Sequence, residues 1–123
     1  MLYDLQIEKE SDFLSVKISG IRNSNTISKA AKEIIETCKI NKCLKVIIDV
    51  RELEGRMSIL ESYMFVSREF THLKQFSSLE KAAVVDNKES KKRLKFFERT
   101  ANSFGFNLRT FVEPDEAREW MTT

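Results

Sequence analysis

Two short apolar runs, each ending at or near an aspartate, constrain the fold of this chain more than any other feature of its sequence. The first spans residues 44–50 and contains Asp49, and the second spans residues 81–86 and ends at Asp86. Nearly continuous apolar runs of this length are typical of strands covered on both faces, which occur mainly in parallel sheets. A stretch with helical periodicity separates the two runs. The sequence therefore predicts two central, parallel strands of an α/β sheet.

The other elements follow from side-chain periodicity and from turn and capping residues. Loose alternation of apolar side chains predicts a β-hairpin formed by residues 3–9 and 13–18. Helical spacing predicts helices over residues 26–39 and 58–76, a third that stops at Gly105 and a fourth over residues 115–121, with a last strand over residues 106–112.

The predicted order of elements is β-β-α-β-α-β-α-β-α. Repeated strand–helix units connect through right-handed crossovers, so the last four strands should pair in parallel. The first strand, turned back by the hairpin, should be an antiparallel edge. The predicted fold class is thus α/β, with a mostly parallel five-stranded sheet and four helices. At 123 residues, the whole chain, residues 1–123, is expected to form a single domain.

Composition excludes several classes of protein. Twenty-one basic residues against 19 acidic ones give a net charge of +2, which is too balanced for a dedicated nucleic-acid binder. No apolar stretch is long enough to span a bilayer and no signal segment is evident, so we expect a cytoplasmic protein. Cys38 and Cys43 have no histidine close by in the sequence. We expect them to be reduced structural thiols, with no metal site.

The stretch of residues 46–58 runs from the first apolar strand into the second helix and is the best candidate site. Ser58 is followed three residues later by Glu61, which is the signature of a capping box. A phosphate or carboxylate at this helix start would meet free backbone N–H groups and the guanidinium of Arg56. The candidate anion or phosphorylation site comprises Asp49, Gly55, Arg56, Ser58 and Asp86. The alternative is purely structural, because strand-end aspartates and capping serines commonly stabilise turns.

The element order, the turn at residues 48–56 (IDVRELEGR) and the segment of residues 101–111 (ANSFGFNLRTF) resemble the STAS/SpoIIAA-like superfamily, in particular the small stand-alone bacterial STAS/SEC14-like proteins. The resemblance implies a relation to anti-sigma-factor antagonists and to CRAL-TRIO lipid-transfer domains. In the antagonists, a partner kinase phosphorylates a serine at the start of the helix after the third strand, within an Asp-Ser-Ser-Gly-like motif. Ser58 occupies the matching place, but the flanking residues Gly55, Arg56, Met57 and Ile59 do not reproduce that motif.

Nothing in the sequence completes a catalytic or cofactor site. The chain has a single histidine, His72, which falls opposite the apolar stripe predicted for the second helix. A nucleophile motif of the G-x-S-x-G type and a glycine-rich phosphate loop are both missing. Asp49 and Asp86 would have to converge in one polar pocket to do acid–base chemistry or to bind Mg²⁺. We therefore expect a non-enzymatic protein without a cofactor.

Two surfaces are candidates for binding a partner. Lys88, Lys92, Lys95 and Arg99 form a basic stripe along the third helix, with Phe96 beside it. It would suit an acidic protein or an anionic membrane surface, or it is simply a solvated helix face. On the second helix, Phe65, His72 and Phe76 fall off the predicted apolar stripe (Ile59, Tyr63, Val66, Phe70 and Leu73). They either form an interface, including that of a homodimer, or are covered by other elements.

The sequence thus predicts a cytoplasmic regulatory module that binds a protein partner and responds to phosphate at the start of the second helix. The alternative is a small-molecule or lipid-binding protein related to CRAL-TRIO domains, which requires a large apolar cavity.

Overall fold

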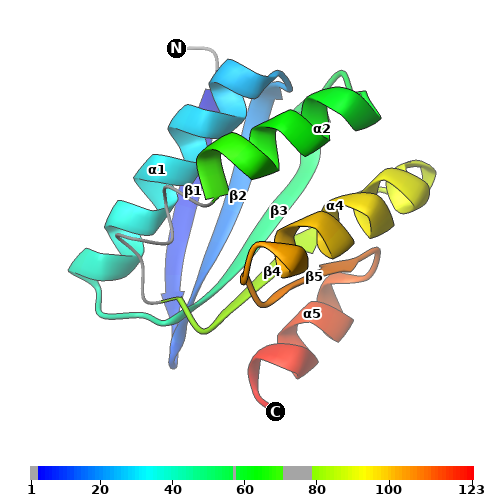
Figure 1. The fold of residues 1–123 in the computed structure, drawn as a ribbon. Coiled ribbons are helices and arrows are strands. Elements are labelled where there is room, and N and C mark those ends of the chain that lie inside the picture. Colours follow the sequence, from blue (N-terminus) through cyan, green and yellow to red (C-terminus); the bar gives the residue numbers. More distant parts are fainter. Residues whose placement is uncertain (1–2, 57, 71–78) are drawn as a thin grey trace.

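The computed structural model describes residues 3–56, 58–70 and 79–123, and its centre is a five-stranded sheet whose strands lie in sequence order (Figure 1). The strands are β1 (Tyr3–Glu10), β2 (Phe13–Ile21), β3 (Lys45–Glu54), β4 (Lys81–Val85) and β5 (Leu108–Phe111). β1 pairs with β2 in the antiparallel sense, and β2 to β5 are parallel to one another. The predicted fold class, element order and antiparallel edge strand are confirmed.

The helices are unequally distributed over the two faces of the sheet. They are α1 (Ser24–Ile40), α2 (Ile59–Phe65), α4 (Lys91–Ser103) and α5 (Pro114–Met121). α2 continues as the π-helical turn η1 (Val66–Phe70), and the 3₁₀ turn η2 (Lys88–Ser90) precedes α4. Helices α1, α2 and α4 lie over one face (Figure 1). α5 packs against the opposite face of the sheet through Ala117 and Met121.

Alternation along the central strands builds a core on each side of the sheet. Val46 and Val84 face the three-helix layer, whereas Ile47, Ala83 and Val85 face α5. Because successive side chains of a strand point to opposite faces, only a strand covered on both sides is apolar along its whole length. The two apolar runs therefore have the structural role that the sequence predicted.

Strand β3 extends four residues beyond the end predicted at Val50. Its pairing with β4 stops at Asp49, but its pairing with β2 continues to Glu54 across a register shift between Lys17 and Ser19. The chain then turns at Gly55, whose φ of 92° lies in the left-handed region that favours glycine. The predicted strand end was wrong because pairing with β2, a long-range interaction, prolongs the strand.

The predicted helix caps are confirmed. Ser58 Oγ accepts from Glu61 N and the Glu61 carboxylate accepts from Ser58 N, both at 3.1 Å, so the capping box is complete. Gly105 has a φ of 93° and follows α4. The N–H of Phe106 donates to Ala101 O and that of Gly105 to Asn102 O, which is the Schellman arrangement.

The buried face of α2 differs from the predicted stripe. Phe65 and Val66 are buried at 1% and 0% exposure, whereas Tyr63 is 48% exposed. Phe65 is therefore a core residue, and its placement on a candidate interaction surface was wrong. Ser62 lines the interior one turn earlier, so the inward face follows i, i+3, i+4 from Ser62. Leu73, His72 and Phe76 lie outside the described residues.

Cys38 and Cys43 are buried and not joined in a disulfide, as the sequence predicted. Burial, together with the neighbouring Cys43, raises the pKa of Cys38 to about 11. Its thiol is therefore protonated at neutral pH, which is the unreactive form.

Candidate functional site

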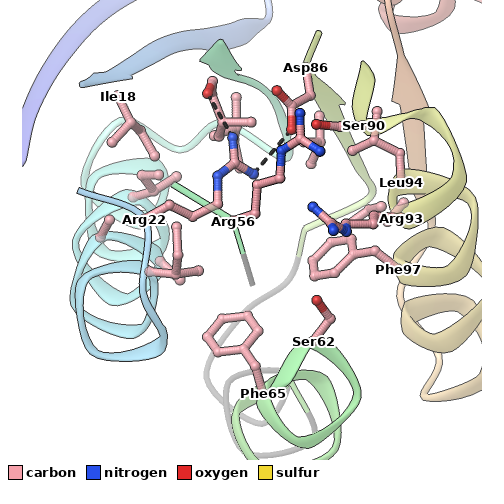
Figure 2. Close-up of a pocket in the computed structure, with 18 residues that line it drawn as sticks. Ile18, Arg22, Arg56, Ser62, Phe65, Asp86, Ser90, Arg93, Leu94 and Phe97 are labelled. Carbon is pink, nitrogen blue, oxygen red and sulfur yellow. Dashed lines mark hydrogen bonds and ion pairs between the residues drawn. The ribbon is translucent and has the colours of Figure 1, made fainter. Parts of the chain in front are cut away.

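A cavity of about 150 Å³ lies between the sheet and the three-helix layer (Figure 2). Most of its wall is apolar. Ile18, Ile48 and Val84 come from three neighbouring strands, Ile34 comes from α1, and Leu94 and Phe97 come from α4. Phe65 of α2 closes the side of the cavity opposite the arginine side chains (Figure 2). The cavity thus forms where three helices meet over the carboxyl-terminal halves of the central parallel strands.

One end of this cavity is strongly polar. Arg22, Arg56, Asp86, Ser90 and Arg93 line it, and Figure 2 shows the side chains of Arg22 and Arg56 pointing toward Asp86. We call these five residues the arginine cluster. Crevices beyond the carboxyl ends of parallel strands are the usual ligand sites of open α/β sheets. The cluster therefore occupies the place where this fold most readily binds a ligand.

Asp86 and Arg22 form the fixed part of the arginine cluster. Asp86 is 1% exposed, and its Oδ2 lies 3.1 Å from Arg22 Nη1. Its Oδ1 accepts from Asn87 N at 2.7 Å. Arg22 Nη2 donates to Val50 O at 3.1 Å. The buried carboxylate therefore holds one arginine in a defined orientation at the cavity wall.

The rest of the arginine cluster is short of negative charge. Three arginines face a single aspartate, so the cavity end carries an excess of two positive charges. Arg56 and Arg93 make no ion pair within the described part of the chain. Arg22 Nε and Arg93 Nη1 are buried and have no hydrogen-bond partner among the described residues. Buried donors are normally paired, so these two atoms favour an anionic guest.

Local sequence explains how each arginine reaches the cavity. Arg22 directly follows β2, and its N–H donates to Glu54 O at 2.7 Å, which fixes it beside the extended part of β3. Arg56 follows the turn at Gly55. Arg93 precedes the buried Leu94 in the first turn of α4. Four separate segments, including the residue Asp86 that directly follows β4, thus converge on one point.

The predicted anion site is divided by the structure. Arg56 and Asp86 line the cavity, while Ser58 is exposed at the start of α2. Asp49 is on the other side of the sheet, because it pairs with Val85, which faces α5, and lies between the cavity-lining residues Ile48 and Val50. Asp49 and Asp86 thus lie at neighbouring strands but on opposite faces of the sheet, so they do not share one pocket.

Asp49 instead forms a local pair with Arg51. Its carboxylate accepts from Arg51 Nε at 3.0 Å and from Arg51 Nη2 at 2.8 Å. Burial tends to raise the pKa of Asp49, but the hydrogen bonds and positive charge of Arg51 outweigh it and leave the pKa below its ordinary value. Asp49 is therefore ionised at neutral pH and structurally occupied.

Sequence reasoning missed Arg22, Ser90 and Arg93. A signal existed for Arg22, which follows a parallel strand just as Asp86 does. Arg93 gives no such signal, since it lies among other basic residues of α4, and only the packing of α4 decides that it lines the cavity.

Two candidate interaction surfaces lie outside the cavity. On α2, Leu60, Tyr63 and Met64 are 67%, 48% and 53% exposed. We call these three residues the α2 patch. They follow the exposed Ser58. Tyr63 belongs here rather than to the core, contrary to the predicted stripe.

The basic stripe lies on η2 and α4. All four of its residues, Lys88, Lys92, Lys95 and Arg99, are exposed, and Phe96 is half-buried. Lys95 lies 3.9 Å from Glu98 in a long, partly exposed ion pair, which contributes little to stability. Whether the stripe binds a partner stays a prediction.

Within residues 3–56, 58–70 and 79–123, no group of three or more His, Cys, Asp or Glu side chains is placed to hold a metal ion. In the same ranges, no helix combines the length and the apolar character needed to cross a membrane.

The sheet order, the antiparallel edge and the three helices over the cavity face define a STAS-like α/β fold. Residues 13–122 match the sequence model of the SpoIIAA-like family, and the chain belongs to this family. A search of curated proteins found no match.

Solved structures share the fold, among them two of low sequence identity to this chain. An anti-sigma factor antagonist from Mycobacterium paratuberculosis is 13% identical, with a TM-score of 0.62 over 98% of this chain and 95% of that one. An uncharacterized protein with a SpoIIAA-like fold from Shewanella loihica PV-4 is 19% identical, with a TM-score of 0.58 over 96% of this chain and 92% of that one. At these identities the likeness concerns the fold.

Proposed function

We propose that this protein is a cytoplasmic, non-enzymatic regulatory module that binds a partner protein through the α2 patch. The observation that carries the proposal is the exposure of Leu60, Tyr63 and Met64 on one short helix. Neighbouring exposed apolar side chains of this size are typical of interaction sites. The likeness to a protein described as an anti-sigma factor antagonist supports a regulatory role.

Phosphorylation of Ser58 is the proposed switch for this surface. Ser58 Oγ accepts the Glu61 N–H, and the Glu61 carboxylate accepts the Ser58 N–H. A phosphate adds nearly two negative charges beside the Glu61 carboxylate. Repulsion would open the capping box and change the start of the helix that carries the α2 patch. A kinase would then be one partner of the protein.

The basic stripe is a proposed secondary contact. Its exposed lysines and arginine would favour an acidic partner or an anionic membrane surface by long-range attraction. The apolar α2 patch also suits a second copy of the chain, so a homodimer is one form that the interaction would take.

Binding measurements with surface variants test the interaction. Tyr63→Asp places a charge in the α2 patch and should abolish capture of partners from the native cells, and Ser58→Asp should change the set that is captured. Ile40→Asp is the matched control, because Ile40 is 74% exposed at the end of α1, outside the patch. Mass spectrometry of the protein from its own cells should find phosphate on Ser58. Identical partners for all variants, with no phosphate found, would refute the proposal.

A second candidate function, small-molecule binding, is favoured by the cavity and its arginine cluster. Pockets for drug-sized ligands occupy roughly 300–1,000 Å³, so a cavity of about 150 Å³ suits a small molecule better than a long-chain lipid. Acid–base catalysis by Asp49 and Asp86 finds no support, because the two carboxylates lie on opposite faces of the sheet.

A further inference from the structure

We propose that the cavity binds a small carboxylate that carries a benzene-sized apolar group, with the carboxylate at the arginine cluster. This inference rests on the second candidate function, small-molecule binding, and names its ligand class. It does not depend on the binding of a partner through the α2 patch.

The size and chemistry of the wall define the apolar half of the ligand. A cavity of this volume, about 150 Å³, is of the size that accepts a benzene-sized molecule. Here Ile34, Ile48, Phe65, Val84 and Phe97 supply such a wall. A single ring or a short branched chain fits, and burying it away from water supplies the affinity.

The unpaired donors define the polar half. Arg22 Nε and Arg93 Nη1 are buried without a hydrogen-bond partner among the described residues. Guanidinium groups bind carboxylates through short, charge-assisted and often bidentate hydrogen bonds. The arrangement in Figure 2, with Arg93 and Phe97 on one wall and Arg22 opposite, leaves the cavity between them. A carboxylate at the polar end would satisfy donors that the protein itself leaves unpaired.

Asp86 sets the charge of the preferred guest. Its buried carboxylate neutralises Arg22 and leaves Arg56 and Arg93 without an ion pair in the described part of the chain. The excess positive charge repels cations. A monoanion offsets one of these two excess charges and meets less repulsion from the buried Asp86 carboxylate than a dianion such as a phosphate monoester would. A carboxylate therefore matches the sign of the charge at this end of the cavity.

A titration with three matched probes tests the proposal. The full chain, labelled with ¹⁵N, is followed by two-dimensional NMR while phenylacetate, phenylacetamide or acetate is added. Phenylacetamide keeps the ring without the charge, and acetate keeps the charge without the ring. We expect saturable shifts at cavity residues such as Ala31, Val50 and Leu94, with phenylacetate binding at least tenfold more tightly than either of the other probes.

Variants locate the two halves of the site. Arg93→Gln should weaken phenylacetate at least tenfold and leave phenylacetamide unchanged, because Arg93 has no ion pair to lose within the described residues. Arg99→Gln is the matched control, an exposed arginine on the same helix, and should change neither affinity. Ala31→Leu adds bulk to the cavity wall and should weaken both ring-containing probes. The NMR spectra without probe show whether each variant is folded.

The outcomes separate this inference from the function on which it rests. If phenylacetamide binds in the cavity as tightly as phenylacetate, the carboxylate class is refuted but small-molecule binding stands. If no probe shifts the cavity residues, or if only residues of the basic stripe respond, both are refuted. Equal effects of Arg93→Gln and Arg99→Gln would also refute the assignment of the carboxylate to the arginine cluster.

Discussion

The buried pair between Asp86 and Arg22 should be the strongest single electrostatic contribution to the stability of this fold. Asp86→Asn keeps the acceptor for the Asn87 N–H but removes the charge that neutralises Arg22, at 3.1 Å in the native protein. Losing one partner of a buried ion pair costs about 3–5 kcal/mol. Because the Arg22 side chain is 18% exposed and keeps its hydrogen bond to Val50 O, we expect the lower end, about 3 kcal/mol.

Urea denaturation measures this loss. With an m-value of roughly 1.5 kcal/mol/M for a chain of this size, the unfolding midpoint of Asp86→Asn should fall by about 2 M. Glu52→Gln is the control, since the Lys17–Glu52 pair is 3.7 Å long with both side chains about half exposed, at 47% and 58%, and should change stability by less than about 0.5 kcal/mol.

A double-mutant cycle isolates the interaction itself. Arg22→Met alone leaves the Asp86 carboxylate buried without its partner, and the double variant removes both charges. The double variant should therefore be about 2 kcal/mol more stable than the sum of the two single losses predicts. If the losses add within about 0.5 kcal/mol, or if Asp86→Asn behaves like Glu52→Gln, the pair is not the stabilising element that we infer.

Three further predictions concern single residues. The folded-state pKa of Asp49 is lowered, so the contribution of its carboxylate to stability is complete above the ordinary carboxyl pKa and is lost as pH falls through the folded value. In urea titrations, the difference in the free energy of unfolding between wild type and Asp49→Asn should therefore shrink from pH 7 to pH 3. A constant difference would contradict this. Ser58→Ala should lower the free energy of unfolding by about 1 kcal/mol through loss of the cap, measured by urea denaturation, whereas Ser58→Thr, which keeps a capping hydroxyl, should lose less. Cys38, with a pKa of about 11, should resist alkylation by iodoacetamide at pH 7.5 in native protein and react in urea, as mass spectrometry of the labelled peptide would show; rapid labelling without urea would contradict its burial.

Local sequence determined much of the fold. The apolar runs around Asp49 and Asp86 identified the two central strands, and the repeated strand–helix units predicted that the last four strands pair in parallel. The Ser58–Glu61 capping box and the turn at Gly105 were also predicted correctly. These features depend on residues within one turn or one strand of each other, so the sequence contains all the partners that they need.

The candidate site was predicted only in part, because it depends on how distant elements pack. Arg56 and Asp86 were identified, but Arg22 and Arg93 become partners in one cavity only when β2 and α4 are placed on the sheet. The sequence did not predict that β3 continues along β2 as far as Glu54. This pairing fixes the backbone two residues before Arg56.

The assignment of faces was likewise decided by tertiary structure. Periodicity shows which side chains share a face, but not which face is buried when a short helix has apolar residues all round, and so Phe65 and Tyr63 were exchanged. Asp49 and Asp86 both follow apolar runs in the sequence. The register of β3 against β4 places their side chains on opposite sides of the sheet. The sequence by itself determined the succession of strands and helices along the chain, the capping box at Ser58 and the turn at Gly105, because those are short-range properties. Only the packing of three helices over the sheet decided where a cavity forms and which charges lie within it.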